Sequence, residues 1–392
     1  HSRATSPHGL SSSPIWSVLP IIIFYTTLKR TVVMELIPGI PDDLARECLV
    51  RADYNQLPTV ISVCKSWSSE VQQPAFRRLR KAASSSKTLI VMAQLRMLQT
   101  QRDASHKERL HPLYRFSVLD PGSGQWNQIP PIVIDSVAAE VPLFCQIVSV
   151  GSDLLVIGGV DPLTWQVSRA VMIFSFLTGK WRRGSDMPGL RRSFFGCAAD
   201  PDARMVYVAG GHDEEKNALR TAMVYDMARD EWAELPDMAC ERDECKAVFG
   251  CGQIHVIGGY RTEMQGKFQR GAEVLDVATR MWESPNENYL DFDACPRTCS
   301  RGGEDETLYM CHDGHVVAKT GTRWQSVCTL PDGVATTTLM SSWRGKLIVI
   351  GSAKFGDPQV AHMLDLGSRR WTVLVTPAEF SGHVQCGCLV EI

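Results

Sequence analysis

The chain has 392 residues, of which 44% are hydrophobic and 21% charged, a composition typical of a globular protein with room for more than one domain. Its formal net charge of −2 gives no indication of binding to nucleic acid or to an anionic membrane surface. The 13 cysteines are odd in number and scattered, which argues against a disulfide framework and favours reduced, intracellular thiols that serve as small core residues.

The first 33 residues precede the first methionine, Met34. Residues 15–25 form an apolar run that Pro20 interrupts, and it is shorter than the roughly 20 residues needed to span a bilayer. Only Arg3 supplies basic charge before the run, and no small-residue cleavage site follows it. Residues 1–33 are therefore predicted to be translated upstream sequence or another non-native leader, in preference to a targeting signal.

Residues 34–80 carry three short helical patterns. Pro41 followed by Asp42 and Asp43 is typical of a helix start, because proline suits the first turn and acids favour its positive end. A second helix is predicted over Pro58–Trp67 and a third from Pro74 through Leu79. Three short helices bury little apolar surface, so this module is expected to need a partner.

A repeat of about 50 residues occupies the rest of the chain. Six tryptophans recur at separations of 42 to 55 residues, each preceded by a short apolar run typical of a strand: Trp126, Trp181, Trp232, Trp282, Trp324 and Trp371. Three of these runs end in Gly-Gly, at 158–159, 210–211 and 258–259. Paired glycines allow a bend where no β-carbon fits, and tryptophan can fill the wedge between adjacent sheets. The pattern predicts a six-bladed β-propeller over residues 84–392.

The ends of the repeat array predict how the ring closes. The first blade has no strand before Thr88 to occupy its innermost position, and the chain ends in an apolar run, GHVQCGCLVEI (382–392). If that run entered the first blade, it would supply the missing strand and remove an exposed edge. Blade 5 is short, with 13 residues from Cys311 to Trp324, so its central hairpin must be tight.

One face of the propeller is predicted to carry the binding loops. In a four-stranded up-and-down blade, the loop between strands two and three lies at the same end as the connection to the next blade. Loops 160–169, 212–220 and 260–270 therefore share a face with stretches 188–193 and 239–245, and they are rich in charge. The candidate substrate-binding residues are Arg191, Arg192, His212, Asp213, Glu214, Lys216, Arg220, Arg242, Asp243, Tyr260, Arg261 and Glu263.

The sequence offers little that indicates catalysis or a cofactor. It contains no phosphate-binding glycine loop and no GxSxG elbow, and the order of Ser, His and Asp residues suggests no hydrolase. Cys295, Cys299 and Cys311-His312 fit no zinc-finger or ribbon spacing. We therefore expect no cofactor and no metal.

Two resemblances follow from these residues. Leu36-x-Pro38, Pro41-Asp-Asp-Leu44 and Val63-Cys-x-x-Trp67 resemble the F-box, and the Gly-Gly and Trp repeat resembles the kelch repeat. Residues 192–232 and 235–245 resemble the plant KISS ME DEADLY family, a similarity running from Met34 to about the C-terminus. The fold implied is an all-β, six-bladed kelch propeller (84–392) preceded by a small α-helical F-box (34–80).

The resemblance implies a non-catalytic function. The F-box would bind a Skp1-type adaptor, and through it a cullin ubiquitin ligase, using Leu36, Pro38, Pro41, Leu44 and Trp67. Family members are receptors for phenylalanine ammonia-lyase and for the type-B response regulators of cytokinin signalling, which implies work in the cytoplasm or nucleus. Partners would be proteins, with no nucleic acid and no membrane.

Two other classes of function stay open. Glu287, Asp291 and Cys295 have the four-residue spacing of the ligands in plant kelch proteins that act as iron-dependent specifiers of glucosinolate breakdown, although a histidine would be expected third. An F-box has no purpose in that chemistry, and bound iron in the purified protein would identify it. The other class is a kelch scaffold without a ligase, against which only the F-box residues argue.

Overall fold

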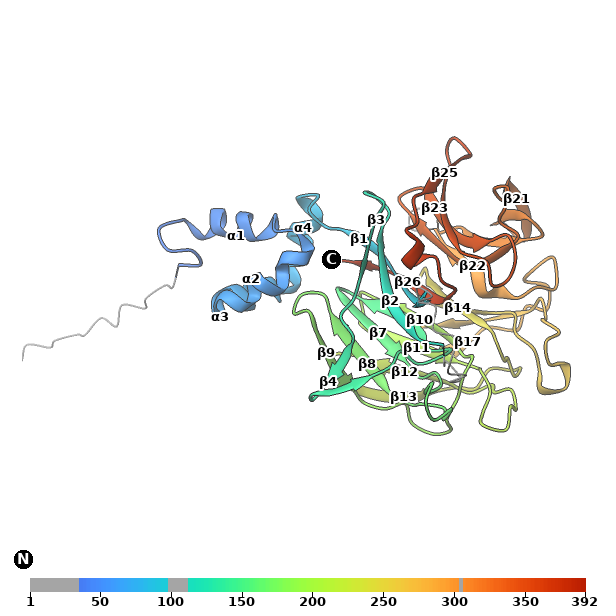
Figure 1. Cartoon of the computed structure of the whole chain (residues 1–392). Helices are drawn as coiled ribbons and strands as arrows, with labels where there is room; N and C mark the ends of the chain where they lie inside the picture. Colours follow the sequence, from blue (N-terminus) through green and yellow to red (C-terminus); the bar gives the residue numbers. More distant parts are fainter. Residues whose placement is uncertain (1–34, 98–111, 303–305) are drawn as a thin grey trace, which may run out of the picture.

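The computed structural model describes residues 35–97, 112–302 and 306–392 (Figure 1). A small helical module lies beside a ring of β-sheets, and the two are joined near the C-terminus. The predicted leader, residues 1–33, lies outside the described residues. Within the described ranges, no helix is both long and apolar enough to cross a membrane.

The helical module comprises four α-helices and one 3-10 turn in the described chain: α1 (Asp42–Val50), η1 (Tyr54–Gln56), α2 (Leu57–Val63), α3 (Lys65–Val71) and α4 (Pro74–Ala82). The predicted start of α1 after Pro41 is confirmed, as is the third helix at Pro74. The prediction of one continuous helix over Pro58–Trp67 is wrong. Cys64 is extended (φ −158°, ψ 167°) and its thiol caps α3 by accepting from the Trp67 amide, so the chain turns between two short helices.

Six four-stranded antiparallel sheets form the ring in the described residues. In order from the centre outward, blade 1 contains β26 (Val384–Glu391), β1 (Thr88–Leu95), β2 (Tyr114–Asp120) and β3 (Gln125–Gln128), and blade 2 contains β6 (Gln146–Val150), β7 (Asp153–Ile157), β8 (Val171–Ser175) and β9 (Lys180–Gly184). Blade 3 contains β10 (Gly196–Asp200), β11 (Met205–Ala209), β12 (Ala222–Asp226) and β13 (Glu231–Leu235).

The other three blades follow the same order. Blade 4 contains β14 (Lys246–Gly250), β15 (Gln253–Ile257), β16 (Ala272–Asp276) and β17 (Met281–Trp282). Blade 5 contains β18 (Ser300–Arg301), β19 (Leu308–His312), β20 (His315–Thr320) and β21 (Arg323–Thr329), and blade 6 contains β22 (Thr336–Trp343), β23 (Lys346–Ser352), β24 (Val360–Asp365) and β25 (Arg370–Leu374). A hairpin of β4 (Ile132–Ile134) and β5 (Val137–Ala139) lies between blades 1 and 2. The central hairpin of blade 5 is tight, as predicted: Asp313 and Gly314, both with positive φ, join β19 to β20.

The C-terminal strand closes the ring. β26 pairs antiparallel with β1 from Thr88↔Glu391 to Gln94↔Val384, which confirms the predicted closure. The amide and carbonyl of Lys87 also exchange hydrogen bonds with Ile392. Because the last strand of the chain completes the first blade, the ring has no unpaired inner strand at the seam.

Each repeat tryptophan ties its blade to the blade before it. All six lie on outermost strands, and each indole N–H donates to a backbone carbonyl at the end of, or beyond, the outermost strand of the preceding blade, at 2.6–3.0 Å. Trp126 of blade 1 donates to Val375 of blade 6, so this series of bonds also crosses the seam. The predicted wedge role is confirmed, with a hydrogen bond added to the packing.

The paired glycines sit where no side chain fits. Gly211 has φ +84°, and a β-carbon there would stand 2.4 Å from the carbonyl oxygen of Ser193. Gly159 and Gly259 hold the same position in blades 2 and 4, with the same clash against Leu143 and Asp243. The Gly-Gly pairs therefore follow from the close approach of each blade's second strand to its incoming segment.

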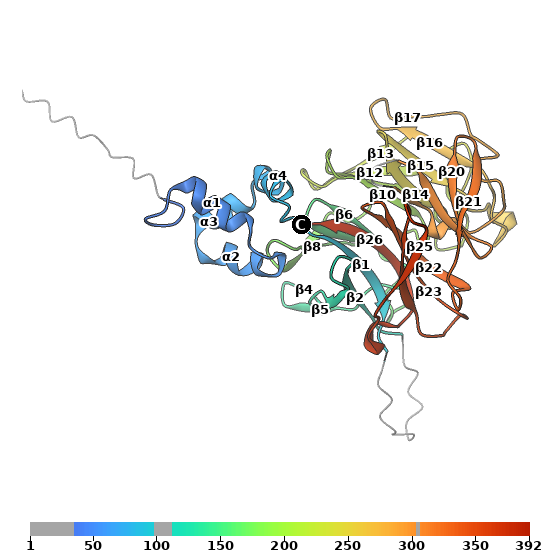
Figure 2. The ribbon, with the colours of Figure 1, turned by 90° about the horizontal axis from the view of Figure 1, so that it is seen from above.

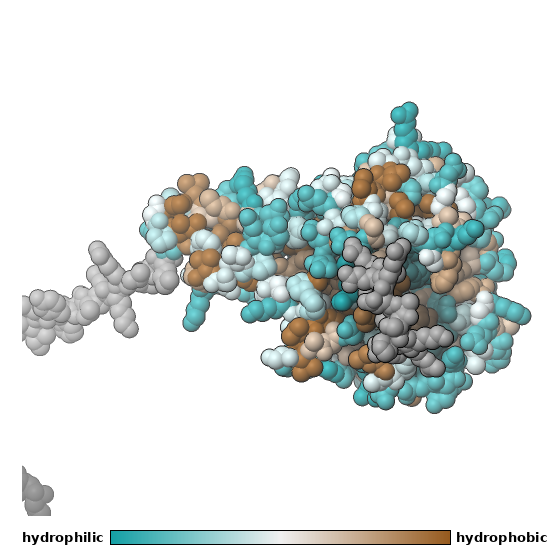
Figure 3. Space-filling model, viewed as in Figure 1, coloured by the Kyte–Doolittle hydropathy of each residue, from teal (hydrophilic) through white to brown (hydrophobic). Residues whose placement is uncertain are grey.

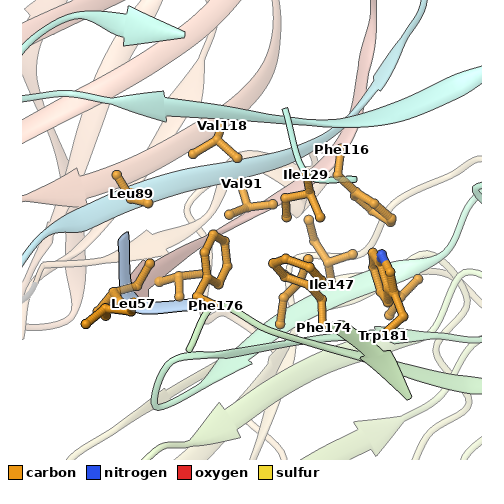
Figure 4. Packing of buried hydrophobic residues seen from close by; sticks show 14 of the residues in the cluster. Leu57, Leu89, Val91, Phe116, Val118, Ile129, Ile147, Phe174, Phe176 and Trp181 are labelled. Carbon is orange, nitrogen blue, oxygen red and sulfur yellow. The ribbon is translucent and has the colours of Figure 1, made fainter. Parts of the chain in front are cut away.

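The helical module docks on blades 1 and 2. Leu57 belongs to the hydrophobic cluster that contains Leu89 of β1 and Phe176 of the β8–β9 turn (Figure 4). Arg77 and Lys81 of α4 form ion pairs with Glu391 of β26, at 3.4 and 3.6 Å. Figure 2 shows the C-terminus between the two parts. The β6–β7 and β8–β9 turns touched by the module lie at the opposite end of the blades from the long loops.

Candidate functional site

The first candidate surface is the exposed part of the helical module. Leu44 on α1 is 55% exposed, and Pro38 and Pro41 are also exposed. Apolar surface gathers on the part of the module farthest from the ring (Figure 3). Val63, at the end of α2, is a further exposed apolar side chain that the sequence reasoning did not select. An apolar surface on a small module is typical of a protein-binding site.

Two of the five residues predicted to bind the adaptor pack inside the module. Leu36 is buried, and its carbonyl accepts a 2.6 Å hydrogen bond from the Trp67 indole. Trp67 is half-buried and packs against the same cluster. The side chain of Leu36 is thus covered by its own module. The assignment of all five residues to the adaptor surface stays a prediction.

The second candidate surface is the propeller face formed by the long loops, which we call the loop face. In blades 3 and 4, the loop between the second and third strands lies against the connection that leads into the blade: Ser193 exchanges backbone bonds with His212, and Asp243 with Tyr260. The amide of Met238 donates to the carbonyl of Arg220 in the same way. The predicted sharing of one face by these segments is confirmed, and this face lies opposite the helical module.

The twelve predicted substrate-binding residues fall into three groups. Six are exposed: Arg191, Glu214, Lys216, Arg220, Arg261 and Glu263. His212 and Asp213 are half-buried, and hydrogen bonds from Asn217 and Glu215 outweigh burial to lower the pKa of Asp213. Four are buried: Arg192, Arg242, Asp243 and Tyr260. The polar groups of the buried four are engaged within the blades, and all twelve residues stay predictions as substrate contacts.

Both buried arginines bind the loops of their own blade. Arg192 donates to the carbonyls of Gly210 and Thr221, and burial lowers the pKa of Arg192 to about 10. Arg242 donates to the carbonyls of Gly258 and Gly271 and to the Glu273 carboxylate at 3.1 Å. The carbonyls of Thr221 and Gly271 also accept from the amides of Gly210 and Gly258, so each guanidinium reinforces the backbone pairing at a Gly-Gly bend. The two arginines therefore hold the loops in place.

Ser193, His212 and Asp243 form a hydrogen-bonded series across blades 3 and 4. Ser193 Oγ lies 2.8 Å from His212 Nε2, and His212 Nδ1 lies 2.8 Å from Asp243 Oδ2. The order of Ser, His and Asp residues in the sequence does not indicate this arrangement, which resembles a hydrolase triad only in its geometry. Ser193 is only 2% exposed and both its backbone groups are bonded to His212. The series links two neighbouring blades and fixes the imidazole ring.

The sequence reasoning missed the apolar side chains of the loop face. In the described part of this face, the large exposed apolar side chains include those of Met97, Phe144, Leu163, Trp165, Leu190, Met264 and Phe355. Trp165 could have been noticed, because it falls outside the period of the other propeller tryptophans and inside a predicted loop. Phe144 and Phe194 lie 50 residues apart at the same position of successive repeats, a second signal in the sequence.

The residues considered as metal ligands make other contacts in the structure. In the described residues no cluster of three or more His, Cys, Asp or Glu side chains has the arrangement to hold a metal ion. Asp291, of the set Glu287, Asp291 and Cys295, accepts a 2.9 Å hydrogen bond from the Trp324 amide. Burial raises the pKa of the Cys295 thiol.

Fold and surfaces together define a kelch-type propeller that carries a helical interaction module on one face and long loops on the other. The family model described as Kelch motif matches residues 143–188 and 191–239, which correspond to blades 2 and 3.

Relatives cover nearly the whole chain. F-box/kelch-repeat protein At1g80440 of Arabidopsis thaliana is 50% identical over 92% of this chain and 100% of its own length. F-box/kelch-repeat protein At1g15670 of the same plant is 46% identical with the same coverage, and F-box/kelch-repeat protein SKIP20 is 30% identical over 88% of this chain and 94% of its own. The chain belongs to the plant F-box/kelch-repeat family. Its closer relation to the KISS ME DEADLY family stays a prediction.

Proposed function

We propose that this chain is the substrate-recognition subunit of an SCF-type (Skp1, cullin, F-box) ubiquitin ligase. The observation that carries the proposal is the joining, in one chain, of an F-box-like module with exposed Leu44 to a propeller whose long loops lie on the opposite face. Full-length similarity to proteins named F-box/kelch-repeat supports it. The subunit contributes binding, and the ubiquitin-transfer chemistry belongs to other members of the complex.

The two surfaces suit two partners at once. An adaptor on the free side of the module leaves the loop face open, because the module touches the ring through turns at the opposite end. A target protein bound by the loops would then be held at a fixed distance from the ligase, since the module is tied to the ring by packing and ion pairs. Such an adaptor role needs no catalytic residue in this chain.

The targets and the compartment are the finer part of the proposal. The resemblance to the KISS ME DEADLY family makes phenylalanine ammonia-lyase and type-B response regulators the candidate targets. Their removal would lower phenylpropanoid synthesis and cytokinin signalling, and it would take place in the cytoplasm or the nucleus.

The double variant Pro41→Ala/Leu44→Ala tests the adaptor surface. We expect its affinity for a Skp1-type adaptor to fall at least tenfold, because truncation of apolar interface anchors commonly costs about 2 kcal/mol or more. Isothermal titration with purified adaptor measures the loss. Met281→Ala is the matched control, since Met281 is equally exposed but lies on blade 4.

Equal adaptor affinity for the folded double variant and the wild type would contradict the proposed function. Co-immunoprecipitation from plant extract, probed for phenylalanine ammonia-lyase and for a type-B response regulator, tests the finer proposal separately. If both proteins are absent from complexes that retain the adaptor, neither is a target of this chain, and the proposed ligase role is unaffected.

A further inference from the structure

Three successive blades present a side chain from a left-handed backbone position at the inner edge of the loop face. Phe144, Phe194 and Glu244 each lie two residues before an innermost strand, with φ of +55°, +55° and +51°. Such a φ is costly for a bulky side chain and persists only where the surroundings enforce it. Because blade 4 carries glutamate at this position, the fold does not require phenylalanine in blades 2 and 3.

The two phenylalanines belong to a fixed aromatic stack, which we call the aromatic rim: Phe144, Phe194 and His212. Phe144 stacks on Phe194 at 4.8 Å between ring centroids, and Phe194 stacks on His212 at 5.2 Å. His212 is held by Ser193 and Asp243, and the Phe144 amide donates to Gln385 Oε1 at 2.8 Å. Phe144 is still 44% exposed. A rigid, partly exposed aromatic surface binds with little loss of side-chain entropy.

Two neighbouring loops extend this surface with apolar and cationic side chains. Leu163 and Trp165 are exposed on the blade 2 loop, and Leu190 on the connection to blade 3. Arg169 donates to the Gly189 carbonyl and Arg191 to the Val167 carbonyl, so the two loops are fastened together.

Within the described chain, this surface carries two arginines whose positive charge no neighbouring carboxylate neutralises. Neither Arg169 nor Arg191 has a carboxylate within ion-pair distance in the described part of the chain. Asp161, the nearest acid in the same loop, accepts from the amides of Leu163 and Thr164. Acids instead gather in the next sector, on the loops of blades 3 and 4: Asp213, Glu214, Glu215, Glu241, Glu244 and Glu263. The charge that complements the blade 2 loop and the connection to blade 3 is therefore negative.

We propose that the blade 2 loop, together with the connections that lead into blades 2 and 3, binds an extended segment of the target protein in which a large apolar residue lies beside acidic residues. The apolar side chain packs on the aromatic rim and Trp165, and the carboxylates pair with Arg169 and Arg191. This rests on the proposed function, because it names the kind of target segment that the receptor would recognise.

The test uses the full chain in complex with its adaptor and a phage-displayed random peptide library as the probe. We expect selected peptides to share an aromatic residue or leucine next to aspartate or glutamate. A synthetic peptide of the selected sequence should bind Phe144→Gly/Phe194→Gly at least tenfold more weakly. Glycine suits the left-handed backbone at both positions, so the rings are removed while the fold is kept. Arg169→Glu/Arg191→Glu should also bind at least tenfold more weakly, with a smaller dependence on salt.

The matched control is Met281→Ala/Val373→Ala, two similarly exposed apolar residues on the outer strands of blades 4 and 6, which should bind as wild type does. The proposal is overturned if the selected peptides are basic or share no motif. It is also overturned if the rim variant, Phe144→Gly/Phe194→Gly, binds the peptide as tightly as the wild type does. A dimer in solution that the rim variant abolishes, without peptide selection, would assign the surface to a second copy and overturn it as well. Adaptor affinity of the wild type is measured in parallel, so failure of the proposed function is distinguished from failure of this site.

Discussion

Arg192 and Arg242 occupy loop positions that, by sequence, are typical of a binding surface, yet their guanidinium groups bind backbone carbonyls inside the blades. Arg242 also faces Glu273, a carboxylate with no exposed surface that accepts from the amides of Ala239 and Cys240. A buried carboxylate is tolerated only while its partners remain. At the scale of the residue, these two loop charges of the propeller therefore serve its structure.

Replacing Arg242 with methionine should destabilise the protein by about 3–5 kcal/mol, because the Glu273 carboxylate then stays buried without its cation. Urea unfolding followed by tryptophan fluorescence measures the change. Arg242→Met/Glu273→Gln should recover most of the loss, since a neutral amide costs less to bury. Arg191→Met, at an exposed position, should change stability by less than about 0.5 kcal/mol. A loss no greater for Arg242→Met than for Arg191→Met would show that the buried pair does not contribute.

At the scale of the element, the C-terminal strand β26 closes the ring and also contacts the neighbouring blade. β26 pairs with β1 along its whole length, and Leu389 accepts from Ser149 of blade 2. The Trp126 indole bond to Val375 is the second connection at the seam. Blade 1 thus holds the ring closed by pairing strands that are about 290 residues apart in the sequence.

A chain that ends at Thr376 should aggregate or lose cooperative thermal unfolding, because the deletion exposes the inner edge of β1 and removes the contact between blades 1 and 2. Differential scanning calorimetry with light scattering gives both readouts. A peptide of residues 377–392 added to the truncated chain should partly restore the transition. An equally sharp transition for the truncated and the full chain would refute the structural role of β26.

At the scale of the whole molecule, two kinds of contact fix the helical module against the ring. Glu391 pairs with Arg77 and Lys81 at partly exposed positions, where such pairs contribute at most about 1 kcal/mol. Leu57 and Phe176 pack in a shared buried cluster, where the apolar contribution is larger. The orientation of the module should therefore depend chiefly on the apolar contact.

Phe176→Ala should loosen the module, because a phenylalanine buried at a contact commonly contributes about 3–5 kcal/mol. Small-angle X-ray scattering should show a larger radius of gyration, and limited proteolysis should cut faster at residues 83–87. Glu391→Gln is the comparison, and it should leave both measurements close to those of the wild type. The assignment of the apolar contact as the main one fails if the two variants have the same scattering profile.

Much of the architecture was predictable because its signals are local or periodic. Six tryptophans, from Trp126 to Trp371, recur at the spacing of the repeat, and the Gly-Gly pairs mark bends that only glycine allows. Blade number and strand order therefore followed from the sequence. Pro41 and Pro74 mark helix starts by the same local logic. The break at Cys64 was missed, because the apolar spacing continues through it while the backbone does not.

The sites were less predictable, since burial depends on residues that are distant in sequence. Arg191 and Arg192 are neighbours in the chain, yet the ring exposes one and places the other against Gly210 and Thr221. No periodicity distinguishes the two.

By itself, then, the sequence determined the number of blades, the closing strand and the F-box-like module, because backbone geometry and local spacing dictate them. The tertiary structure alone decided which loop charges support the blades and which apolar side chains are exposed. It also brought Ser193, His212 and Asp243 together and stacked Phe144 on Phe194. The physical reason is that these contacts join residues distant in the sequence, so each exists only once the blades have folded and packed together.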